Sequence, residues 1–292
     1  MRTRFALAII LLMSAATIAG ELNAVVLNAP RIDKGKLRIL PNDNGVDLEK
    51  YGISVHFYWP ADEKILDTEA AKAGISTAEF KKRFAGEFKA LDDTFIDALS
   101  KAKFLYITQY SAAAIIPLSQ KQEYAEAVKK FLENGGTLYM DLFAVSSYGD
   151  RLLDFVKVGN PSLAGDSSSG KNTGVYQAVP GTAVIEHPLL NFPHKIRGGQ
   201  KGYGCYSSEF PGQLPLFVKE SAPEFPAMLL QEKVCGKGRI IFCQIPAFFR
   251  NSASDIEVGK MLENILSYVY GTDIRKEADR KLLENGGPGE DI

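Results

Sequence analysis

One carboxylate stands out because it ends an apolar run. Asp141 follows Thr137-Leu138-Tyr139-Met140, and a carboxylate inside a buried strand costs free energy unless it is paired or lies near the strand end. Ser146 and Ser147 follow this run, Gln109 and Tyr110 follow the apolar run 104–108, and Gln244 ends the run that begins at Ile240. Ligands of open α/β sheets bind at the carboxyl ends of the strands. We therefore expect these six residues to line a site for a small polar ligand such as a sugar; the alternative is that they only satisfy loop backbone groups.

A cysteine in a glycine-rich segment is the second candidate. Cys205 lies in Gly202-Tyr203-Gly204-Cys205-Tyr206-Ser207, and a thiolate there with His187 or His194 would form a nucleophilic pair. No clear buried strand precedes the segment, so a structural cysteine is the favoured interpretation. No catalytic residue is assigned.

Two further patterns, for a phosphate-binding loop and for a zinc site, lack residues that these sites require. The segment 165–172 is similar to a phosphate-binding loop, but Asn172 stands where a Ser or Thr should hold magnesium. His56, His187 and His194 do not have the spacing of a zinc helix. We expect neither a cofactor nor a metal.

The cysteines leave the disulfide state open. Cys235 and Cys243 flank a Gly-Lys-Gly turn at unequal distances, which argues against a direct bridge across it. One disulfide with one free thiol fits the composition, as do three reduced thiols.

The clearest structural unit spans 103–143. Phe104–Thr108 is short, apolar and β-prone. A helix is predicted from Pro117 and Ser119, with Gln122 completing a capping box, and Asn134-Gly135-Gly136 should end it. A strand over 137–143 would complete a βαβ unit with parallel strands.

A second unit closes the domain. The runs 227–230 and 240–243 flank Cys235-Gly236-Lys237-Gly238-Arg239 and predict a β-hairpin. An apolar stripe from Val258 to Val269 predicts a covering helix that ends before Gly271. The fold class expected is α/β, a mostly parallel open sheet with helices on both faces, plus this C-terminal hairpin and covering helix.

Other segments give weaker indications. Strands are expected over 24–27, 36–40 and 54–59, and helices after Ser76 and after Asp93. The stretch 159–181 is rich in Gly and Ser and predicts a long loop.

The N-terminus predicts export. Arg2 and Arg4 precede an uncharged apolar run, and small residues up to Gly20 follow, which is the pattern of a cleavable secretory signal. The expected organisation is a signal peptide over 1–20, one domain over 21–272 and a charged, frayed tail over 273–292. The mature chain would be periplasmic or extracellular, without stable membrane insertion. A formal net charge of −1 without a clustered basic face argues against a nucleic-acid partner.

The order of parts resembles the class I glutamine-amidotransferase-like (flavodoxin-like) fold, and most of all its uncharacterised exported bacterial branches. The resemblance rests on 104–143, on Glu186-His187-Pro188-Leu189-Leu190, on the Gly236–Arg239 turn and on the final helix. Members that hydrolyse glutamine carry a cysteine in a glycine-flanked elbow directly after the strand corresponding to 137–143. Here Asp141 to Ser147 contains neither cysteine nor glycine, so glutamine hydrolysis by that mechanism is not expected.

Three functions remain open at this point. The preferred hypothesis is an exported, non-catalytic domain that binds a carbohydrate or a partner protein. The alternatives are a hydrolase with a site around Asp141 or Cys205, and a structural scaffold subunit.

Overall fold

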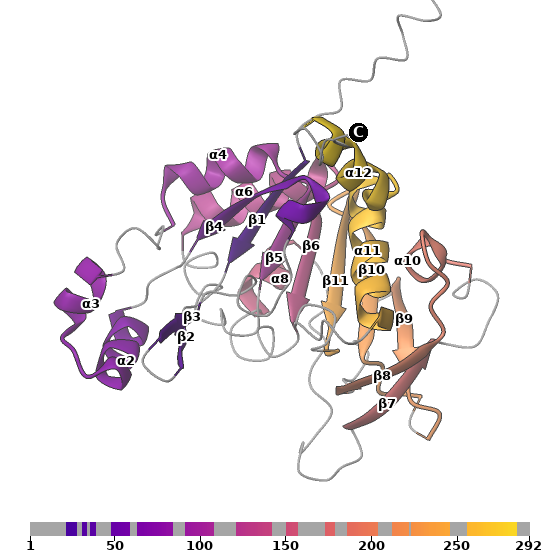
Figure 1. Cartoon of the computed structure of the whole chain (residues 1–292), viewed down its shortest axis with the longest axis horizontal. Coiled ribbons are helices and arrows are strands. Elements are labelled where there is room, and N and C mark those ends of the chain that lie inside the picture. Colours follow the sequence, from indigo (N-terminus) through magenta and orange to yellow (C-terminus); the bar gives the residue numbers. More distant parts are fainter. Residues whose placement is uncertain are drawn as a thin grey trace, which may run out of the picture.

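The protein is built on one nine-stranded sheet (Figure 1). In the computed structural model, the described residues are 22–27, 31–33, 36–38, 48–58, 63–83, 91–107, 121–141, 150–156, 173–178, 186–203, 212–221, 223–245 and 256–284. The strands of the sheet follow the order β4-β1-β5-β6-β11-β10-β9-β7-β8.

Half of the sheet is parallel. Its members are β4 (Ile53–Tyr58), β1 (Leu22–Leu27), β5 (Phe104–Ile107), β6 (Thr137–Asp141) and β11 (Gly238–Cys243). The pair β5–β6 flanks helix α6 (Gln122–Glu133) in the chain, so the predicted βαβ unit with parallel strands is confirmed.

The other half is antiparallel. The predicted hairpin is formed by β10 (Met228–Val234) and β11, and the sheet continues through β9 (Gln213–Val218), β7 (Thr173–Ala178) and β8 (Gly198–Tyr203). A separate two-stranded ribbon contains β2 (Arg31–Asp33) and β3 (Lys36–Arg38).

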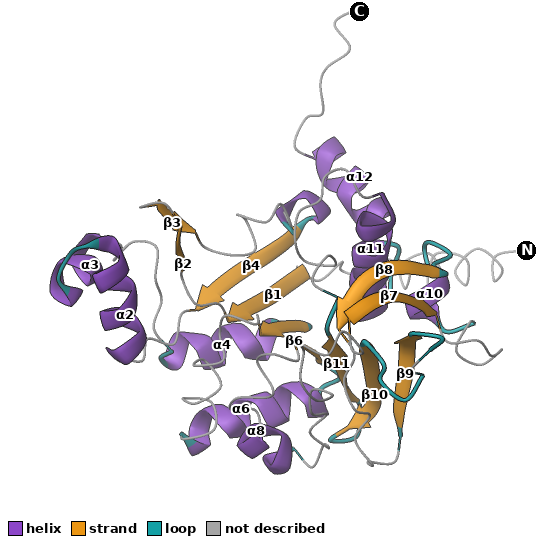
Figure 2. Ribbon diagram, turned by 90° about the horizontal axis from the view of Figure 1, so that it is seen from below, coloured by secondary structure: helices purple, strands orange, loops and turns teal. Residues whose placement is uncertain are grey.

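Helices cover both faces of the sheet (Figure 2). One face carries α4 (Asp93–Lys101), α6 and α8 (Asp150–Phe155). The opposite face carries α11 (Ile256–Tyr270), with the short α10 (Pro188–Asn191), η2 (Glu49–Tyr51) and α12 (Ile274–Glu284) beside it. Helices α2 (Glu63–Ala73) and α3 (Thr77–Arg83) lie to one side, near the ribbon (Figure 1). The predicted fold class is therefore confirmed.

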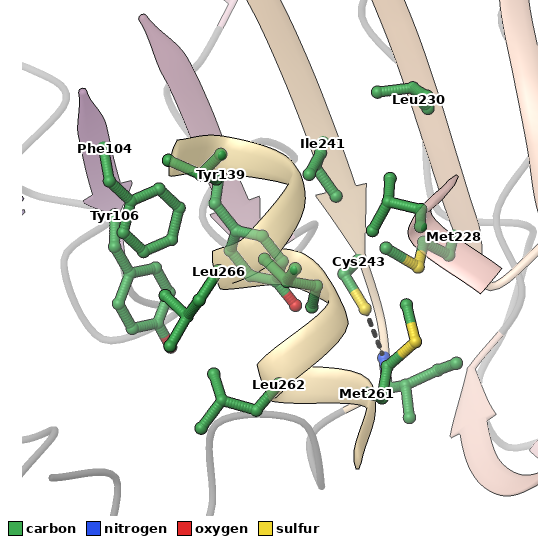
Figure 3. Packing of buried hydrophobic residues seen from close by; sticks show 14 of the residues in the cluster. Phe104, Tyr106, Tyr139, Met228, Leu230, Ile241, Cys243, Met261, Leu262 and Leu266 are labelled. Carbon is green, nitrogen blue, oxygen red and sulfur yellow. Dashed lines mark hydrogen bonds between the residues drawn. The ribbon is translucent and has the colours of Figure 1, made fainter. Parts of the chain in front are cut away.

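Strand alternation divides the core into two layers. Tyr139, Ile241 and Cys243 face α11, whereas Leu138 and Met140 face α4, α6 and α8. Figure 3 shows Leu262 and Leu266 of α11 against the rings of Phe104, Tyr106 and Tyr139. The stripe predicted for the last helix is buried from Met261 to Val269, because this helix covers the middle of the sheet.

Glycines allow the end of α6 to touch two strands. Gly135 ends the helix with φ +89°, as predicted, and a Cβ on Gly136 would lie 2.4 Å from the Phe131 ring. A Cβ on Gly238 would lie 2.8 Å from the Leu132 backbone. The Gly-Lys-Gly turn is thus a packing requirement as well as a hairpin signal.

Two predicted helix caps are corrected. Helix α6 begins at Gln122 with Lys121 at the N-cap and no side-chain cap bond, so the Ser119 capping box is wrong, and Ser119 lies outside the described residues. Asp92 caps α4 through the Thr94 N–H, one residue before the predicted Asp93. The cap at Ser76 is confirmed by the bond from the Glu79 N–H to Oγ, at 3.1 Å.

Three segment predictions also change. The expected loop over 159–181 contains strand β7, and the expected strand over 36–40 is the short β3 of the separate ribbon. Within the tail expected over 273–292, Ile274–Glu284 forms α12, whose first residue Ile274 is fully buried and at whose start Asp273 accepts the Arg275 N–H. Tertiary burial thereby orders a segment whose composition is mostly charged.

Candidate functional site

The carboxyl ends of the three central parallel strands lie at one rim of the sheet. Ile107 pairs with Met140 across β5 and β6, and Asp141 pairs with Cys243 across β6 and β11. In Figure 1 the arrowheads of β6 and β11 point to the same edge. This register confirms the placement of strand ends on which the predicted ligand site depends.

The predicted site residues are only partly described. The backbone of Asp141 ends β6, and Gln244 follows β11 directly. Gln109, Tyr110, Ser146 and Ser147 lie outside the described residues. Convergence of the six side chains therefore stays a prediction.

Gln244 is the described member with an informative environment. Its side chain is 2% exposed, and its backbone N–H donates to the Ala227 carbonyl at 2.8 Å, which extends the β10–β11 ladder by one residue. Within the described parts of the chain, its buried Nε2 has no hydrogen-bond acceptor. A buried amide left in this state costs about 1–3 kcal/mol, so the strand end holds donor capacity that the fold does not use.

A cleft of about 870 Å³ opens at the opposite, amino-terminal ends of β5, β6 and β11. Its polar lining comes from the residues before these strands, from α10 and from the end of α11: Lys103, Asn134, Glu186, Asn191, Lys237, Arg239 and Tyr268. No local pattern in the sequence predicts this cleft, because α10 and the end of α11 reach the strand starts only through the tertiary fold.

Arg239 is held at the floor of this cleft by Tyr268. Its guanidinium donates to the Tyr268 carbonyl at 2.8 Å and lies 4.7 Å from the centre of the Tyr268 ring. The Tyr268 hydroxyl donates to Glu232. Burial, reinforced by the Glu232 carboxylate, raises the pKa of Tyr268 far above its ordinary value, so this phenol stays a donor at physiological pH.

His187 caps the helix that forms one wall. Its Nδ1 accepts the Leu189 N–H at 3.2 Å, and its Nε2 lies 4.0 Å from Glu232. Burial lowers the pKa of His187, while the Glu232 carboxylate acts in the opposite direction. The neutral ring required by the cap is therefore the form that the folded protein favours.

His194 belongs to a separate polar cluster. Its ring contacts the Glu263 carboxylate, which also accepts the Tyr51 hydroxyl at 3.0 Å. The fully buried Asn264 bonds the His194 backbone in both directions. This cluster fixes the chain after α10, and neither His187 nor His194 is shown beside a cysteine.

The cysteine and metal hypotheses gain no support. Cys205 and its segment beyond Tyr203 lie outside the described residues, and strand β8 ends at Tyr203. Cys235 lies in the turn between β10 and β11, Cys243 ends β11, and the two are not bonded to each other. The described residues contain no group of three or more His, Cys, Asp or Glu side chains suited to a metal. Nor does that part of the chain contain a helix with the length and apolarity to cross a membrane.

Comparisons with known proteins give similarity of fold alone. No protein-family model and no curated protein matches the sequence. A cytoplasmic protein from Salmonella typhimurium is similar at 10% identity and a TM-score of 0.49, over 85% of this chain and 98% of that one. A ThuA-like protein from Bacteroides uniformis matches at 13% identity and a TM-score of 0.41, over 85% and 91%. A β-galactosidase from Rahnella sp. R3 matches at 12% identity and 0.40, over 84% and 31%. At these values the similarities do not assign the chain to a family.

Proposed function

We propose that this protein is an exported, non-catalytic domain of the class I glutamine-amidotransferase-like type that binds a carbohydrate at the carboxyl rim of its parallel sheet. The observation that carries the proposal is the buried Gln244 amide at the end of β11, one residue beyond the Cys243–Asp141 pair. A site built from Asp141, Gln244 and the predicted loop residues would offer both acceptors and donors.

A carboxylate and an amide at the same rim suit sugar hydroxyls. A hydroxyl can donate to a carboxylate and accept from an amide N–H. Burial makes an amide with no acceptor costly, and a ligand oxygen that accepts from Nε2 would recover that cost on binding. Neutral saccharides therefore fit this rim better than apolar ligands.

Absence of the amidotransferase elbow supports binding rather than hydrolysis. The chain after β6 has neither the cysteine nor the glycines that an exposed nucleophile requires. Export is inferred from the charged, apolar and small-residue segments of residues 1–20.

The test is calorimetric titration of the mature chain with a panel of neutral oligosaccharides. Gln244→Met removes the amide at nearly constant volume, so it should leave folding stability unchanged or higher while weakening binding at least about tenfold. Asp141→Ala should weaken binding to a similar degree.

Gln231→Met is the matched control. Gln231 is a half-buried glutamine whose buried Oε1 has no hydrogen-bond donor among the described residues. It pairs with Ile240, four positions before Gln244 along β11 and roughly 13 Å from it. It should leave saccharide binding unchanged. The proposal fails if the panel gives no binding, or if the Gln244 and Asp141 variants bind as tightly as the wild type.

Export has its own measurement. The mass of the chain recovered from the periplasm or medium should correspond to cleavage after Ala19 or Gly20. A chain that keeps Met1 and stays in the cytoplasm would contradict this half of the proposal.

A further inference from the structure

The cleft at the amino-terminal rim is the second place where the protein leaves polar groups available. Backbone bonds tie the strand starts together there: the Thr137 N–H donates to the Lys103 carbonyl at 2.9 Å, and the Arg239 N–H donates to the Gly136 carbonyl at 3.1 Å. The residues that begin β5, β6 and β11 are therefore held in a fixed row. Two strand spacings separate Lys103 from Arg239, which is roughly 10 Å.

Positive charge predominates in the lining. Lys103, Lys237 and Arg239 face the cleft, against Glu186 as the lining carboxylate. Within the described parts of the chain, neither lysine forms an ion pair, and both side chains are exposed. Glu232 lies opposite Arg239 across β10 and β11, outside the lining, and accepts the Tyr268 hydroxyl. The two lysines thus remain able to pair with a ligand.

Arg239 is oriented in advance. Its contacts with Tyr268 are a backbone carbonyl bond and a ring face, and neither neutralises its charge. A guanidinium has five N–H donors in a planar fork that matches a carboxylate. Holding it in place before binding reduces the entropy that a ligand must overcome.

The wall of the cleft adds an aromatic surface and amides. Phe192 is 45% exposed, which is unusual for a large apolar side chain beside a cavity. Asn134 adds an amide group to the same lining, whereas the Asn191 amide already donates to the His187 carbonyl. Sugar rings present C–H faces to aromatic rings and hydroxyls to amides, whereas a simple inorganic anion uses neither.

We propose that this cleft binds an acidic oligosaccharide, with uronate carboxylates paired to Lys103, Lys237 and Arg239 and a sugar face on Phe192. A chain with one carboxylate on each sugar can place one charge beside Lys103 at the start of β5 and another beside Lys237 and Arg239 at the start of β11. This site is separate from the carboxyl rim and does not depend on the function proposed there.

The experiment measures binding of a galacturonic acid trimer to the mature protein, with a neutral galactose trimer of equal length and inorganic pyrophosphate as comparison ligands. The acidic trimer should bind, and its affinity should fall as salt concentration rises. Lys103→Ala and Lys237→Ala should each weaken it about fivefold, and Phe192→Ala about tenfold.

Two controls keep the result specific. Lys82→Ala removes an exposed lysine from α3, which contributes no residue to the cleft, and should leave affinity unchanged. Lys237→Arg keeps the charge and should bind within about twofold of the wild type. Gln244→Met should also have no effect here, which separates this site from the carboxyl rim.

Several outcomes would overturn the inference. Equal binding of the neutral trimer would show that charge is not recognised. Equal binding of pyrophosphate would show an inorganic anion site rather than a saccharide site. Wild-type affinity in the Lys103 and Lys237 variants would show that the cleft is not where the trimer binds.

Discussion

Replacing Asn264 with leucine should be among the most damaging single changes on α11. Its side chain is fully buried and makes three bonds: Oδ1 accepts the His194 N–H at 2.8 Å, and Nδ2 donates to the His194 carbonyl at 2.8 Å and to the Leu189 carbonyl at 3.0 Å. Leucine has a similar size but can form none of them. Three backbone groups would lose these bonds in a buried region.

The magnitude follows from the number of bonds. Each net hydrogen bond contributes about 1 kcal/mol, and an orphaned buried group costs about 1–3 kcal/mol. Asn264→Leu should therefore lower the free energy of unfolding by about 3–5 kcal/mol. For a domain of this size, that corresponds to a melting temperature lower by about 6–20 °C.

Thermal unfolding followed by circular dichroism gives the measurement, with guanidinium titration to verify that the slope m is unchanged. Asn191→Ala is the control, since the Asn191 amide donates to the His187 carbonyl at 3.0 Å in a partly exposed position. It should cost no more than about 1 kcal/mol. A loss below about 2 °C for Asn264→Leu would refute the claim that this side chain holds the chain after α10.

Two glycines should respond to alanine with opposite signs, and one histidine should govern part of the acid response. Gly238→Ala should destabilise by about 1–3 kcal/mol, because its Cβ would meet the Leu132 backbone at 2.8 Å. Gly259→Ala should stabilise by about 0.4–1 kcal/mol, because it is exposed within α11 and its Cβ would meet no atom within 4 Å; melting temperatures that move in the same direction would contradict this pair. Since the pKa of His187 is lowered on folding, the unfolded chain binds more protons, and stability falls as pH drops below the ordinary histidine pKa of about 6.5. His187→Asn keeps a capping side chain but does not titrate in this range. Its stability, measured by denaturant unfolding, should therefore fall less than that of the wild type between pH 8 and pH 5. Parallel profiles of stability against pH for the two proteins would count against this assignment.

Local signals in the sequence were sufficient for the central unit. Short apolar runs, a helical stripe and the Asn-Gly-Gly stop predicted β5, α6, β6 and the β10–β11 hairpin, because each depends on neighbours within a few residues. The predicted cap at Ser119 was wrong because a capping motif contains few residues, and tertiary contacts decide at which turn a helix begins. Helix α12 was missed because its charged composition conceals the burial of Ile274.

The two candidate sites also differ in how much of each could be predicted from the sequence. The sequence by itself determined that a polar residue ends β6 and that polar residues follow β5 and β11. Parallel pairing of these strands brings their carboxyl ends to one rim. Only the tertiary structure revealed that the Gln244 amide is buried without an acceptor, and that Lys103, Lys237 and Arg239 share a cleft with Phe192. These residues are separated by up to 141 positions in the chain. Sheet order and helix packing, which are non-local, bring the members of the cleft together.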